Sequence, residues 1–72
     1  MNIEVYLRED SQQRLVSVTA LKTIKKVSSG DVEEFSDFQN LYLLDDSSYI
    51  FIGRETLLVR GSDIVYVLFK ES

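Results

Sequence analysis

The first third of the chain alternates apolar and polar residues in a way that predicts two β-strands. Residues 2–8 place aliphatic side chains at every second position, namely Ile3, Val5 and Leu7. The opposite face carries Glu4, Tyr6 and Arg8. Residues 14–20 repeat the pattern after a polar turn, with an apolar face of Val16, Val18 and Ala20. Since a period of two is the repeat of a half-buried strand, both segments are predicted to be strands.

Residues 20–27 are compatible with two structures. Helical spacing relates four apolar residues, Ala20, Leu21, Ile24 and Val27. The two lysines that follow Ile24 would suit a helix C-terminus. However, three residues of the segment are β-branched, which favours a strand that continues through a bulge near Leu21. We favour the strand.

A short helix is predicted over residues 31–39, after a turn at residues 28–30. Asp31 followed three positions later by Glu34 resembles a capping box, and acids in a first turn suit the helix dipole. Apolar residues then recur every third position, at Val32, Phe35 and Phe38. We expect an α-helical or 3₁₀ turn with its phenylalanines directed inward.

The remainder of the chain reads as a meander of four short strands. They are predicted over residues 41–44, 49–52, 56–60 and 64–70. The turns between them lie at residues 45–48, 53–55 and 61–62, and the last is a Gly-X hairpin signal. The expected fold is therefore a single small β domain over residues 1–72. Its predicted architecture is an antiparallel β-roll or SH3-like barrel of five to six strands with one short helix near 31–39.

Two of these strands carry more apolar surface than one face needs. Residues 49–52 and 64–69 are apolar on both faces, and such strands should be covered on both. We expect Ile50, Ile52, Val65 and Val67 to face the core with the first strands, although the last strand could present its alternate set. The surplus is then a candidate partner-binding strip of Tyr49, Phe51, Tyr66 and Phe69. The alternative is a barrel that closes around both faces.

The composition narrows the possible chemistry. The chain has no histidine and no cysteine, which removes the commonest general base, the thiol nucleophile and the usual zinc ligands. No serine, lysine or carboxylate falls in a recognisable catalytic motif. We therefore expect no enzyme, no cofactor, no metal and no small-molecule substrate. No apolar run approaches the roughly 20 residues of a membrane span, and no leader pattern begins the chain. A soluble cytoplasmic protein is expected.

Charge is distributed unevenly around a net value of −4. Four cations without an intervening acid form a candidate basic patch: Arg14, Lys22, Lys25 and Lys26. Six acids follow before the next cation: Asp31, Glu33, Glu34, Asp37, Asp45 and Asp46. The simplest interpretation is two neighbouring elements with opposite charges. The favoured function is a non-enzymatic interaction module that forms a homodimer or docks on a protein partner. The alternative is a nucleic-acid-binding accessory protein that uses the basic patch.

Overall fold

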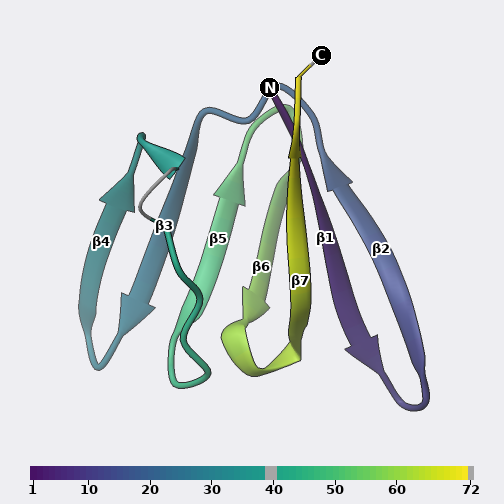
Figure 1. Ribbon diagram of the computed structural model, residues 1–72. Coiled ribbons are helices and arrows are strands. Elements are labelled where there is room, and N and C mark those ends of the chain that lie inside the picture. Colours follow the sequence, from purple (N-terminus) through teal and green to yellow (C-terminus); the bar gives the residue numbers. More distant parts are fainter. Residues whose placement is uncertain (39–40, 72) are drawn as a thin grey trace.

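A computed structural model describes residues 1–38 and 41–71 of the chain (Figure 1). Within these residues the chain forms seven strands: β1 (Asn2–Glu9), β2 (Gln12–Val18), β3 (Thr23–Ser28), β4 (Asp31–Phe35), β5 (Ser48–Ile52), β6 (Thr56–Arg60) and β7 (Ile64–Lys70). A single 3₁₀ turn, η2 (Gly61–Asp63), joins β6 to β7. The prediction of a small, mainly β protein is confirmed.

The strands form two open antiparallel sheets. The three-stranded sheet has the order β2-β1-β7, and the four-stranded sheet has the order β4-β3-β5-β6. The chain leaves the first sheet after β2 through Ala20, whose backbone has a left-handed φ of 52°. It returns to that sheet after β6 through η2. The predicted β-roll or SH3-like barrel of five to six strands is not confirmed, because the described residues form seven strands in two sheets that do not close into a barrel.

One apolar cluster joins the two sheets. Its buried members are Ile3, Val5, Val18, Leu21, Ile24, Tyr49, Phe51 and Ile64. The prediction that the aliphatic faces of β1 and β2 point inward is confirmed at Ile3, Val5 and Val18, none of which is exposed. Strict alternation on these strands made the inward face unambiguous.

Strand β5 faces the opposite way from the prediction. Tyr49 and Phe51 have no exposed surface, whereas Ile50 and Ile52 are only half-buried on the other face. The register with β3 explains the choice, because it sets Phe51 beside the buried Ile24. Burying the two larger aromatic side chains also removes more apolar area from water.

The helix predicted over residues 31–39 is wrong at residues 31–35. Residues 31–35 are strand β4, which pairs with β3 from Ser28↔Asp31 to Ile24↔Phe35. The turn between them has positive φ at Ser29 (50°) and at Gly30 (85°). Two central residues with positive φ are characteristic of a type I′ hairpin, which matches the strand twist. The hairpin therefore overrides the capping pattern. Gln39, the last residue of the predicted helix, lies outside the described residues.

Two further predictions concern residues 20–27 and residues 41–44. The strand favoured within residues 20–27 is confirmed as β3, although it begins only at Thr23. The strand predicted over residues 41–44 is absent, since this stretch is irregular and packs Leu41 and Leu43 against the core. The buried Tyr49 hydroxyl fixes the stretch by accepting a 2.7 Å bond from the Leu44 N–H. The same hydroxyl donates to the carbonyl of Tyr42 over 3.4 Å.

Close backbone approaches hold the connections in place. A side chain at Gly61 would overlap the Leu44 carbonyl oxygen, so only glycine fits there. On the other side of the molecule, the Glu55 carboxylate accepts bonds from the Thr19 N–H (2.7 Å) and from its hydroxyl (2.9 Å). The backbone bond, followed by the hydroxyl bond, holds the pKa of Glu55 below its ordinary value. This contact joins the β5–β6 turn to the end of β2.

Candidate functional site

The outer face of the three-stranded sheet carries a row of aromatic and aliphatic side chains across all three strands. Tyr6 of β1 lies opposite Leu15 of β2 on one side and Tyr66 of β7 on the other. The rings of Tyr6 and Tyr66 stack with their centroids 4.4 Å apart. Leu68 follows Tyr66 by two positions on the same face. We call the set of Tyr6, Leu15, Tyr66 and Leu68 the aromatic face.

Three of these side chains are exposed to solvent, and Tyr6 is half-buried between them. Leu15 exposes 47% of its surface, Tyr66 43% and Leu68 41%. Isolated exposed apolar residues are ordinary on protein surfaces, but here the apolar residues lie opposite one another on adjacent strands. A flat apolar surface with two stacked phenols at its centre is typical of a protein-docking face, because tyrosine tolerates both water and a partner.

Charged residues border the aromatic face at both ends of β1. At one end, the Glu4 carboxylate lies 3.3 Å from the Lys70 amine and accepts a bond of 3.3 Å from the Tyr6 hydroxyl. Arg8 lies at the other end, two positions beyond Tyr6 on the same side of the strand. Desolvation, together with the nearby Glu4 and Tyr66, raises the pKa of Tyr6 above its ordinary value of 10.0. Tyr6 is therefore a neutral donor at physiological pH.

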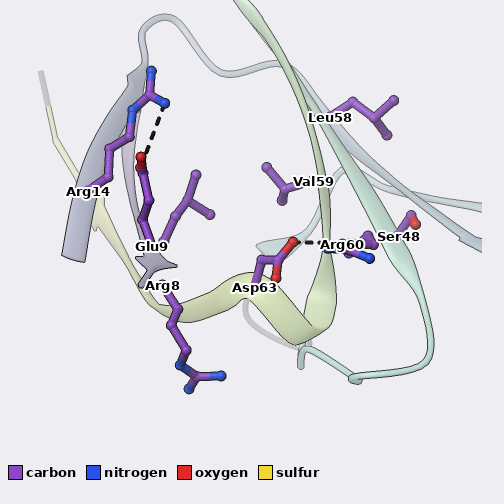
Figure 2. A pocket seen from close by; sticks show the side chains of 9 residues that line it. Arg8, Glu9, Arg14, Ser48, Leu58, Val59, Arg60 and Asp63 are labelled. Atoms are coloured by element: carbon purple, nitrogen blue, oxygen red, sulfur yellow. Dashed lines mark hydrogen bonds and ion pairs between the residues drawn. The ribbon is translucent and has the colours of Figure 1, made fainter. Parts of the chain in front are cut away.

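A second surface feature is a groove of about 520 Å³ between the end of the β1–β2 hairpin and strand β6 (Figure 2). Leu7 and Val59 supply apolar lining, and Leu58 and Ser48 complete the β5–β6 side. Three arginines and two acids surround them: Arg8, Arg14, Arg60, Glu9 and Asp63. Two ion pairs bridge these groups, Arg60–Asp63 at 3.1 Å and Arg14–Glu9 at 3.8 Å. The groove therefore has an apolar lining and a mixed, slightly cationic border.

The structure separates the four residues of the predicted partner-binding strip. Tyr49 and Phe51 are core residues with no exposed surface, so they are unsuited to an interface. Tyr66 is exposed on the aromatic face, as the strip required. Phe69 points to the inner side of β7, where its ring stacks on Phe38 with centroids 5.5 Å apart, and it keeps 37% of its surface exposed. Only Tyr66 is thus part of the surface described above.

The predicted basic patch is dispersed. Arg14 lies on β2 beside the groove, whereas Lys22 lies on the connection between β2 and β3. Lys25 and Lys26 are consecutive residues of β3, so their side chains point to opposite faces of the sheet. Across the β3–β4 hairpin they lie opposite Glu34 and Glu33, respectively. This register agrees with the simpler interpretation, in which neighbouring strands carry opposite charges.

Sequence reasoning missed three of the four residues of the aromatic face: Tyr6, Leu15 and Leu68. A signal existed for Tyr6, because it is a large aromatic residue on the polar face of a clearly amphipathic strand. Its alignment with Leu15 and Tyr66 depends on β7 pairing with β1, and that long-range pairing leaves no local pattern.

No family model, curated protein or solved structure matches this chain. Across residues 1–38 and 41–71, no helix has the length and apolar character needed to cross a membrane.

Proposed function

We propose that this chain is a non-enzymatic protein-interaction module that self-associates as a two-fold dimer through the aromatic face. The observation that carries the proposal is the continuous row of Leu15, Tyr6 and Tyr66 across three strands, in which Leu15 and Tyr66 are exposed and Tyr6 is half-buried between them. A second copy would cover this row by packing sheet on sheet, as the two layers of a β-sandwich do.

The charges around the row favour a second copy as the partner. Glu4 and Arg8 flank Tyr6 symmetrically on the same face of β1. A two-fold axis that crosses β1 at Tyr6 in the plane of the interface makes the two β1 strands antiparallel. Glu4 of each copy then lies over Arg8 of the other, so two opposite charges meet twice. Such an isologous contact needs no surface beyond the one described.

The remaining residues of the two ends are also compatible with this arrangement. Ser17 lies opposite Glu4 in the register, and Gln13 lies opposite Arg8, so polar residues meet polar residues. Val65 lines a shallow hollow with Arg8 and Gln13, which places an apolar side chain where Leu68 of the other copy would lie.

The size of the face sets the expected affinity. Three strands about 4.8 Å apart and about seven residues long, at about 3.4 Å per residue, project roughly 350 Å² per copy. A standard stable interface buries about 800 Å² per partner. The dimer is therefore expected to be weak and concentration-dependent.

The dispersed lysines give less support to the alternative of nucleic-acid binding, which requires cations along one track. Its test is a band shift with single-stranded and duplex nucleic acid at low salt. A salt-dependent shift that survives replacement of Tyr66 would favour this alternative.

Replacing Tyr66 by lysine tests the proposed dimer. The change puts a charge at the centre of the interface without touching the buried cluster. Sedimentation equilibrium should show the dimer dissociation constant rising at least about tenfold, because like charges then oppose each other across the two-fold axis. Tyr42→Lys is the matched control, since the side chain of Tyr42 is 70% exposed and lies away from the aromatic face. Equal association of the two variants would contradict the proposal.

A charge exchange tests the orientation of the dimer. Arg8→Glu alone should weaken association by placing two carboxylates together, whereas Glu4→Arg combined with Arg8→Glu should restore it. Failure of the double variant to recover would show that Glu4 and Arg8 do not meet.

A further inference from the structure

The four-stranded sheet ends in two strands of opposite character. At one end, β4 carries three carboxylates in five residues: Asp31, Glu33 and Glu34. At the other end, β6 has the sequence Thr-Leu-Leu-Val-Arg and contains no acid. The most exposed aliphatic residue of each strand is Val32, at 62%, and Leu58, at 67%. Since like charges that face each other across strands destabilise pairing, β4 suits β6 better than a second β4.

The groove described above runs along the free edge of β6. Successive residues of a strand point to opposite faces, yet both Leu58 and Val59 line the groove. Figure 2 shows Val59 directed into the gap between β6 and the β1–β2 end, with Leu58 on the other side of the strand. Arg14 and Arg60 border the gap, and each is paired with a single exposed acid. Exposed pairs of this kind are weak, so both guanidinium groups are available to a further carboxylate.

The strand directions allow a second copy to continue the sheet. The four strands alternate in direction, so β4 and β6 run opposite to each other (Figure 1). A copy placed beside β6 in the same orientation therefore brings an antiparallel β4 to that edge and keeps its core face on the same side. From this placement we infer that copies of the chain associate head to tail, with β4 of one adding to β6 of the next. This contact uses the two edges of the four-stranded sheet together with Arg14, whereas the proposed dimer uses the outer face of the three-stranded sheet.

One register satisfies both the apolar and the charged residues. Four residues lie side by side across the four strands and point to the same face of the sheet: Glu34, Lys25, Ile50 and Leu58. Val32 is two positions from Glu34 on β4, so it points to the face of Leu58 as well. Placing Val32 opposite Leu58 brings the two exposed side chains into cross-strand contact. The same register sets Asp31 opposite Val59, inside the groove beside Arg14. The sheet gains backbone hydrogen bonds along an edge that would otherwise remain open to non-specific pairing.

A charge-exchange experiment tests the head-to-tail contact. All chains carry Tyr66→Lys to weaken the aromatic-face dimer. The acidic strand is reversed with Asp31→Lys and Glu33→Lys, and the groove with Arg14→Glu and Arg60→Glu. By sedimentation velocity, the Tyr66→Lys parent should associate, and each reversed chain alone should associate at least about tenfold more weakly. A 1:1 mixture of the two reversed chains should recover the parent's association, because each then offers the complementary edge.

Two further variants complete the test. Lys22→Glu reverses an exposed charge on neither edge and should leave association unchanged. Val32→Asp keeps all three arginines and should weaken association as the reversals do, which provides a second variant if a reversed chain loses its β-rich circular dichroism spectrum. A monomeric parent at millimolar concentration, reversed chains that associate like the parent, or a mixture that fails to recover would each overturn the inference. If only the proposed aromatic-face dimer is wrong, the wild-type chain and the Tyr66→Lys parent should associate equally strongly.

Discussion

The facing of β5 leads to a quantitative prediction about two adjacent residues. Phe51 is completely buried between the sheets, whereas Ile50 is half-buried on the outer face. Phe51→Ala should cost about 3–5 kcal/mol, because it removes a large buried side chain and leaves a cavity. Ile50→Ala should cost only about 1–2 kcal/mol, since part of that side chain already contacts water.

These costs are large for a chain of this size. At about 0.05–0.15 kcal/mol per residue, 72 residues provide roughly 4–11 kcal/mol of stability. Phe51→Ala is therefore expected to remove between about a quarter and all of it, and Ile50→Ala to leave a folded protein. Urea unfolding followed by circular dichroism, at a fixed low protein concentration, measures both changes. A larger loss for Ile50→Ala than for Phe51→Ala would refute the assigned facing of β5.

Three further substitutions test the contacts that fix the loops. Gly61→Ala forces a methyl group onto the Leu44 carbonyl oxygen, so it should lower the urea midpoint strongly. In the comparison variant Gly30→Ala the methyl group meets no neighbouring atom, and the midpoint should fall only through the strain of a positive φ. Tyr49→Phe leaves the Leu44 N–H without its partner, so it should cost about 1–3 kcal/mol with no change in the unfolding slope. Glu55→Gln tests linkage: the folded pKa of Glu55 is lowered, so its contribution is present above the unfolded value of 4.5 and is lost as pH falls through the folded pKa. The stability difference between wild type and Glu55→Gln should therefore shrink between about pH 7 and about pH 3, and a constant difference would contradict this role.

The sequence predicted the parts of the fold that depend on local alternation. Only one face of β1 is aliphatic, so that face, with Ile3 and Val5, had to be the one that packs on the core. In β5 both faces are apolar, and local pattern alone left the choice open until the partner strand was known. The register with Ile24 made that choice, and it reversed the roles of Phe51 and Ile50.

The failed helix has a different physical cause. An acid followed by two glutamates resembles a helix start, but the same residues tolerate the exposed edge of a sheet. The Ser29-Gly30 turn, with positive φ at both residues, favours the hairpin, and a helix this short is too costly to nucleate to compete with it. The candidate basic patch failed for a simpler reason, because adjacent residues of a strand, such as Lys25 and Lys26, point in opposite directions.

The surface proposed for function could be only partly anticipated. The excess of apolar residues indicated that some aromatic side chains would remain exposed, and Tyr66 is one of them. The neighbours of Tyr66 come from β1 and β2, which are more than 45 residues away in the sequence. Their approach is decided by packing of the whole chain.

The proposed dimer is tested most directly by isotope-filtered NMR on a 1:1 mixture of labelled and unlabelled chains at millimolar concentration. The arrangement predicts intermolecular contacts from the rings of Tyr6 and Tyr66 to the same residues of the second copy, and between the Leu15 side chains. Contacts between Glu4 and Arg8 of different copies should accompany them. A spectrum without intermolecular contacts at these residues would contradict the account.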